Sequence, residues 1–190
     1  MPTQTSAPPV ESIFHWTVEK YHQLIDTGIL GETDKIELIR GNIVQMSPIN
    51  PPHAAAVDTL ARAFYKKLPD DVLVRVQNPV TLSEDSEPEP DIALVRMAEH
   101  RYRKRHPSVD DILLVIEVAN SSGEKDRHSK IPMYAQARIE EVWLVDLRQK
   151  QLWAYLDPQN DHYKTIRIFD KEIISPLFVS NVTIDVAGLF

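Results

Sequence analysis

Two carboxylates border apolar segments in the middle of the chain. Glu117 lies near the end of the almost continuously apolar run 112–118, and Asp91 directly precedes the short apolar run 92–95. A carboxylate beside a sheet core is costly unless something pairs with its charge. A divalent ion with oxygen ligands, for which Mg²⁺ is usual in phosphoryl chemistry, would relieve the repulsion between two such groups. The alternative is that Glu117 is solvated at a strand end or paired with an arginine.

The elements that would position these carboxylates are helices and strands in a mixed order. Apolar residues at i, i+3, i+4 and i+7 over 53–68 predict an amphipathic helix. Thr17 is expected to cap an earlier helix that ends at Gly28, and Gly41-Asn42 to form a turn. This order predicts an α/β (α+β) fold with a mixed central sheet flanked by helices. The expected strands are 43–46, 72–76, 92–95, 112–118, 142–145, 152–156 and 163–169.

A third helix is expected over roughly 129–137, after a polar turn at 120–123. It contains Pro132, which has no backbone N–H to donate to the preceding turn. Because the first turn of a helix needs no such donor, we expect this helix to begin just before the proline.

The composition limits the domain organisation and the classes of function. Residues 1–11 are expected to be a disordered lead-in and 12–190 a single domain. The absence of cysteine excludes disulfides and thiolate-held metals, and it fits a cytoplasmic protein. The sequence contains no apolar run of about 18 residues, so no membrane span is predicted. The net charge of -7 argues against non-specific coating of nucleic acid but permits local binding.

Other catalytic patterns are missing from the sequence. Ser121-Ser122 lacks a surrounding G-x-S-x-G and is interpreted as a turn, and the five glycines form no phosphate-binding loop. The basic run 101–106 is interpreted as an exposed loop, with a phosphate-gripping loop as the alternative. Tyr134 and Trp143 are expected in the core. The absence of H-x-H and H-x-x-x-H spacing argues against a histidine-held zinc. The histidines considered are His15, His22, His100, His106, His128 and His162.

A set of ordered motifs runs through nearly the whole chain. The motifs are ELIRGNIVQMSP at 37–48 with His53 after it, Pro90-Asp91, EVANSS at 117–122, Asp126-x-x-x-Lys130-x-x-x-Tyr134-Ala135, and EVWLVD at 141–146. Together they resemble the Uma-two family of restriction-endonuclease-like proteins, within the PD-(D/E)XK nuclease superfamily. The resemblance extends from about Thr17 to Phe190.

The resemblance implies a restriction-endonuclease-like core that hydrolyses phosphodiester bonds of DNA with Mg²⁺, or Mn²⁺ in its place. Asp91, Glu117 and the backbone carbonyl of Val118 would hold the metal. Glu37 would add an acidic group to the site, and His53 would approach it. A lysine would orient the attacking water, and the enzyme would act as a homodimer on duplex DNA.

Two positions depart from the family pattern. The superfamily expects lysine two residues after the glutamate, where this chain has Ala119. Lys130 is the expected substitute and Lys125 the second choice, while Asp126 would pair with Lys130 or cap the third helix. Arg138 replaces a usual glycine, at some conformational cost. Ala119 also leaves open a different function, a catalytically inactive nucleic-acid- or protein-binding module on the same fold.

Overall fold

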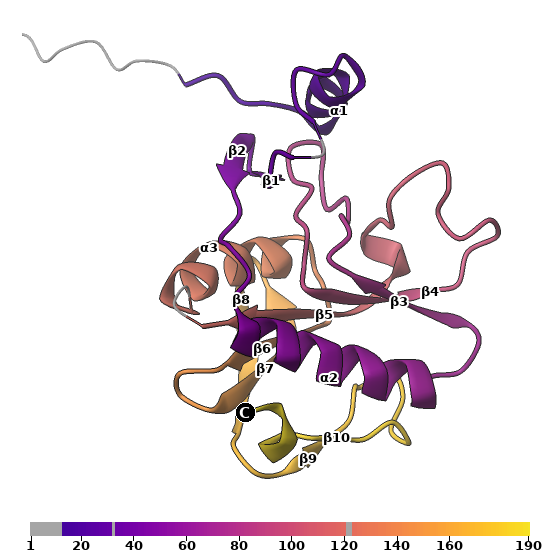
Figure 1. Cartoon of the computed structure of the whole chain (residues 1–190), viewed down its shortest axis with the longest axis vertical. Helices are drawn as coiled ribbons and strands as arrows, with labels where there is room; N and C mark the ends of the chain where they lie inside the picture. The colour runs from indigo at the N-terminus through magenta and orange to yellow at the C-terminus, as the bar shows by residue number, and fades with distance from the viewer. Residues whose placement is uncertain (1–12, 32, 121–122) are drawn as a thin grey trace, which may run out of the picture.

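A six-stranded sheet with strand order β3-β4-β5-β6-β7-β8 forms the centre of the molecule (Figure 1). The computed structural model describes residues 13–31, 33–120 and 123–190, without the side chains of 123–128. Strands β5 and β6 pair in parallel, and the other neighbouring strands of this sheet pair antiparallel. The strands are β3 (Val72–Val76), β4 (Ile92–Arg96), β5 (Ile112–Ala119), β6 (Glu141–Asp146), β7 (Gln151–Gln159) and β8 (His162–Phe169).

Helices cover the two faces of this sheet. Helix α2 (Pro51–Lys67) packs on one face, and α3 (Gly123–Gln136), which connects β5 to β6, packs on the other. Side chains alternate along β5, so that Ile116 joins the α2 side of the core and Val115 the α3 side. Glu117 has the same parity as Val115. The strand's two-residue period therefore turns this carboxylate toward α3.

A smaller group of elements lies beyond the edge of the sheet. Helix α1 (Val18–Asp26) and the hairpin of β1 (Ile36–Ile39) and β2 (Asn42–Gln45) stand at the top of Figure 1, away from α2. The hairpin is joined to the segment before β4, because Leu38 and Glu87 exchange backbone hydrogen bonds of 2.8 and 3.4 Å. This pairing brings β1 next to residues 84–91, a stretch that is rich in acidic residues and proline.

The remaining elements close the α2 side of the core. They are the short strands β9 (Ile173–Ile174) and β10 (Ile184–Asp185) and the 3₁₀ helix η2 (Ala187–Leu189), while another 3₁₀ helix, η1 (Val109–Asp111), precedes β5. Within the described part of the chain, no helix is long and apolar enough to cross a membrane.

The turn of the β1–β2 hairpin is one residue earlier than expected. Ile39 pairs with Asn42, so Arg40 and Gly41 form the turn, with φ angles of 47° and 73°. Two-residue hairpin turns with positive φ at both positions match the twist of the strands. Gly41 has a further constraint, since a Cβ there would lie 2.6 Å from His15 Nδ1.

The expected start of the third helix was wrong. Helix α3 begins at Gly123, so Pro132 lies inside it rather than in its first turn. A proline inside a helix removes one backbone hydrogen bond and costs about 3 kcal/mol. Burial of the neighbouring side chains against the sheet offsets this cost. These side chains belong to Ile131, Met133 and Tyr134.

Several other local expectations are confirmed. Thr17 caps α1 by accepting a hydrogen bond from the Lys20 backbone N–H, and Gly28 follows with φ of 73°. Arg138 has φ of 60° just after α3, the left-handed conformation that favours glycine. The basic run at 101–106 is a loop, and Trp143 is buried. The predicted lead-in at 1–11 lies outside the described residues.

Candidate active site

Three of the predicted site residues meet between β1, β5 and α3. Lys130 Nζ lies 3.0 Å from Glu37 Oε2 and 3.2 Å from Glu117 Oε1. All three side chains are largely buried, with exposed fractions of 12% for Lys130 and 6–7% for the carboxylates. The amine therefore neutralises charge between two carboxylates that come from separate parts of the fold.

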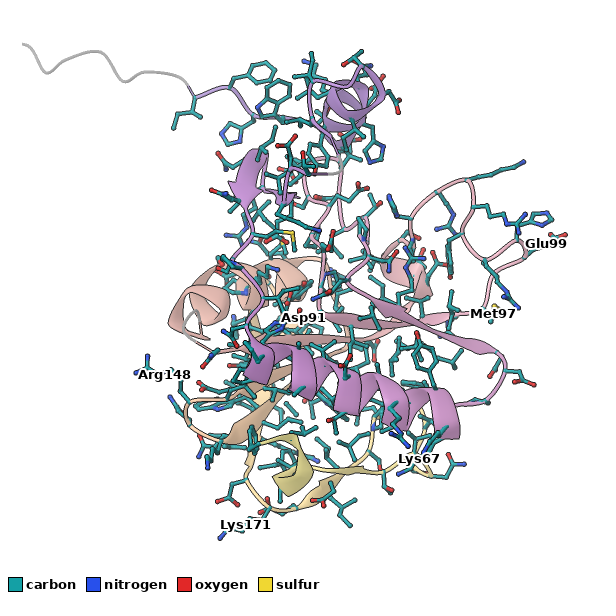
Figure 2. All side chains as sticks on the ribbon, viewed as in Figure 1. Lys67, Asp91, Met97, Glu99, Arg148 and Lys171 are labelled. Carbon is teal, nitrogen blue, oxygen red and sulfur yellow. The ribbon has the colours of Figure 1, made fainter. Side chains whose placement is uncertain are left out.

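Asp91 is hydrogen-bonded to Val118, the residue of β5 that follows Glu117. Its Oδ2 accepts a 2.8 Å hydrogen bond from the Val118 backbone N–H and lies 3.1 Å from His53 Nε2. Its Oδ1 lies 3.4 Å from the Gln77 side-chain amide. Figure 2 shows Asp91 close to the first turns of α2, at the opposite end from Lys67. His53, an accessory candidate from the sequence, thus lies at Asp91, and Gln77 is an additional contact.

Burial determines the electrostatics of Glu117. The pKa of Glu117 is raised to about 8, chiefly by desolvation and also by the charges of Asp91 and Glu37, although Lys130 and the hydrogen bond from Tyr134 lower it. The single positive charge of Lys130 therefore does not fully offset the burial of Glu117 and the negative charges of Asp91 and Glu37. The donors gathered here are oxygens from carboxylates, the ligand type that Mg²⁺ and Mn²⁺ prefer, so the residues fit a hard divalent cation.

Tyr134 contacts the site although the sequence indicated only a core residue. Its hydroxyl donates a 2.6 Å hydrogen bond to Glu117 Oε1. Desolvation, together with the charge of Glu117, raises the pKa of Tyr134 well above its ordinary value. The phenol therefore stays protonated and remains a donor. The four-residue spacing between Lys130 and Tyr134 was the available signal, because it places both side chains on one face of α3.

Glu89 is a second residue that the sequence analysis missed. Its backbone N–H donates a 3.1 Å hydrogen bond to Glu37 Oε2. Burial raises the pKa of Glu89, and the charges of Lys35, Glu37, Lys130 and Asp91 also act on it. The signal lay in the alternation of acids and prolines at 87–91, since every second residue of an extended segment faces the same side.

The structure also brings together two histidines that the sequence spacing did not relate. Among the described residues, His22, Glu87 and His106 form a group whose ligand atoms all lie within 4.8 Å of one another. Glu37, Asp91 and Glu117 do not form a group this tight. The absence of H-x-H and H-x-x-x-H spacing concerns only histidines that are close in sequence. His22 and His106 are distant in sequence and come from separate segments.

Some of the other predicted residues lie outside the described part of the structure, whereas Ala119 lies within it. The side chains of Lys125 and Asp126, the two accessory candidates near the start of α3, lie outside the described residues, as do Ser121 and Ser122. Ala119, at the usual lysine position, is fully buried, and its carbonyl accepts a 2.9 Å hydrogen bond from Leu147. The role of the Val118 carbonyl as a metal ligand stays a prediction.

Comparisons with known proteins agree with this architecture. A solved structure titled "a putative nuclease belonging to DUF820", from Anabaena variabilis ATCC 29413, matches with a TM-score of 0.71. The two chains are 18% identical over 92% of this chain and 97% of that one, which shows a shared fold. No curated protein matches the chain. A family model described as "Putative restriction endonuclease" matches residues 18–187, and the chain therefore belongs to the Uma2 family, as its motifs predicted.

Proposed function

We propose that this protein is a metal-dependent endonuclease that hydrolyses phosphodiester bonds of DNA. The observation that carries the proposal is the convergence of Lys130 with Glu37 and Glu117, beside Asp91. A lysine among buried carboxylates supplies the residue types that metal-assisted phosphodiester hydrolysis requires. Membership of a family described as restriction endonucleases supports the same reaction class.

Asp91 and Glu117 would hold a Mg²⁺ or Mn²⁺ ion, with Val118 contributing its carbonyl. When bound, such an ion polarises a phosphoryl oxygen and acidifies a water molecule. The protein's own part is to fix its carboxylates in place. His53 and the Val118 N–H orient Asp91, and the Tyr134 hydroxyl orients Glu117.

Lys130 would take the role of the lysine that Ala119 cannot supply. It lies on α3, four residues before Tyr134, and reaches back to Glu117 at 3.2 Å. From this position its ammonium group can donate a hydrogen bond to the attacking water and balance negative charge on the phosphate. This relocation favours a catalytic role over the inactive binding module, because the lysine's charge and donors are retained at the site.

The test is cleavage of a mixture of plasmid, linear duplex and single-stranded DNA by the full chain, with Mg²⁺ or Mn²⁺. We expect Asp91→Ala and Lys130→Ala each to reduce cleavage by about 100-fold or more. The matched controls Asp58→Ala and Lys164→Ala change exposed residues on α2 and β8 and should cleave as the wild type does. Equal cleavage by wild type and Asp91→Ala would refute the site.

We further propose that the protein acts as a homodimer, since two copies related by a two-fold axis can each cut one strand of a duplex. Sedimentation at micromolar concentration with and without duplex DNA tests this. A mass corresponding to one chain under both conditions would contradict the dimer. It would not affect the proposal that each site cleaves one strand.

A further inference from the structure

A second cluster of ligand-type side chains shares no residue with the carboxylate site. It consists of His22 on α1, Glu87 in the segment before β4, and His106 in the loop after β4. His22 Nε2 lies 2.6 Å from Glu87 Oε1, and the His22 and His106 rings have centroids 6.0 Å apart. Two imidazoles and a carboxylate therefore face one another across three segments that are distant in sequence.

We propose that His22, Glu87 and His106 bind a divalent transition-metal ion of the zinc type. Two histidines and one glutamate are a common ligand set for zinc with an open coordination position, whereas Mg²⁺ rarely takes imidazole. Donor atoms around tetrahedral zinc lie about 3 to 3.5 Å apart. The His22–Glu87 separation is 2.6 Å and no separation exceeds 4.8 Å, so small rotations of the partly exposed histidines would bring the ligand atoms to the zinc spacing.

The surroundings of Glu87 support a built site. Its side chain is only 2% exposed, and its second oxygen, Oε2, accepts a 2.7 Å hydrogen bond from the Thr81 hydroxyl. Such a second contact fixes the orientation of a metal-binding carboxylate. The Thr81 backbone N–H also donates a 2.8 Å hydrogen bond to the Pro107 carbonyl. The segments that carry Glu87 and His106 are thus tied together by the same residue.

The adjoining cavity has the charge expected of a cation site. A cavity of about 460 Å³ is lined by the three ligands and by further acidic side chains. Lys35 is the lysine in its lining, and Arg75 is a second cation close enough to influence His106. Besides the ligand Glu87, and Glu37, which pairs with Lys130, the acidic residues in the lining are Asp26, Asp34 and Glu89.

A bound ion would also fasten α1 to the segment before β4 and the loop after it. The hydrogen bonds that join α1 to its surroundings include one of 2.8 Å from the Val18 N–H to the Glu84 carbonyl and one of 3.3 Å from the Tyr21 hydroxyl to the Ile36 carbonyl of β1. A metal shared by His22, Glu87 and His106 would add a link between all three segments and stabilise the folded chain.

The experiment titrates the chelator-treated full chain with Zn²⁺, and separately with Co²⁺, whose visible absorption reports histidine-containing tetrahedral sites. We expect one equivalent to bind and to raise the melting temperature. Glu87→Gln and His106→Gln should each weaken binding by about 100-fold. Circular dichroism checks their folding, and the partly exposed His106 provides a variant with little risk to the core. The matched control His162→Gln, an exposed histidine on β8, should bind as the wild type does.

The Asp91→Ala protein separates this site from the proposed nuclease site. Zinc binding should persist in Asp91→Ala, whether or not the wild type cleaves DNA. Binding that is lost in Asp91→Ala yet unchanged in Glu87→Gln and His106→Gln would assign the ion to the carboxylate site and overturn the proposal. The absence of any zinc or cobalt binding by the wild type would overturn it as well.

Discussion

The hydroxyl of Tyr134 and the carboxylate of Glu117 form a hydrogen bond of 2.6 Å between two buried side chains. This contact connects α3 to the C-terminal end of β5, where the candidate metal site lies. It assigns to Tyr134 a task beyond filling space, since the ring packs in the core while its hydroxyl orients a carboxylate.

Replacing Tyr134 with phenylalanine should weaken metal binding while largely preserving the fold. Loss of the hydroxyl leaves Glu117 free to rotate, so we expect the affinity for Mn²⁺ to fall by about 10-fold. Stability should fall by about 1 kcal/mol, the usual net value of one hydrogen bond. Isothermal titration calorimetry and urea denaturation measure the two effects.

Tyr163→Phe is the matched control for this change. The Tyr163 hydroxyl is also buried and donates a 2.8 Å hydrogen bond to the Ile139 carbonyl, and β6 and β7 separate its strand, β8, from β5. It should therefore lose comparable stability and keep the wild-type Mn²⁺ affinity. Equal affinity in Tyr134→Phe and Tyr163→Phe would show that Tyr134 has only a packing role.

Removing the charge of Lys130 should make stability depend more strongly on metal. Lys130→Met keeps the side-chain length but leaves Glu37 and Glu117 buried without their cation. We expect a loss of about 3 kcal/mol in the metal-free protein, as for other broken buried ion pairs. Thermal unfolding with and without Mg²⁺ should show a larger stabilisation by metal in Lys130→Met than in the wild type. An equal or smaller response would contradict a metal near Glu117.

Acid should destabilise the protein partly through Asp111. Hydrogen bonds from Arg105 first, and from Ser108, lower the pKa of Asp111 from 3.8 to about 2. Because the folded state holds the proton less tightly than the unfolded state, this contribution is complete above about pH 4 and is lost as the pH falls through 2. Urea denaturation over this range should show a weaker pH dependence in Asp111→Asn. The exposed neighbour Asp110, changed to Asn, should leave the profile of the wild type unaltered.

Glycine at position 138 should stabilise the protein. Arg138 has φ of 60° and is exposed, and the Ile139 N–H donates a 3.0 Å hydrogen bond to the Tyr134 carbonyl across it. Glycine adopts this conformation without strain, so Arg138→Gly should gain up to about 1 kcal/mol in chemical denaturation. Arg138→Ala retains the strain and should gain less. A destabilised Arg138→Gly would mean that the arginine side chain makes a stabilising contact.

Local patterns in the sequence were sufficient for most of the sheet. The predicted strand at 72–76 coincides with β3, and the apolar run from Ile112 predicted β5 to within one residue. Hydrophobic periodicity and turn residues act over a few positions, so they can be recognised without knowing the fold. The same patterns misplaced the start of α3, because burial against the sheet overrides the local preference of Pro132.

The sequence by itself determined the chemical types available, namely carboxylates beside apolar segments, an alanine two residues after Glu117 where the superfamily expects lysine, and Lys130 as its substitute. Only the tertiary structure decided which of them meet. Pairing of β4 with β5 sets Asp91 beside Val118, and the crossover through α3 returns Lys130 to Glu117. The meeting of His22, Glu87 and His106 depends equally on how distant segments pack. Such contacts arise from strand register and helix packing, which no local pattern encodes.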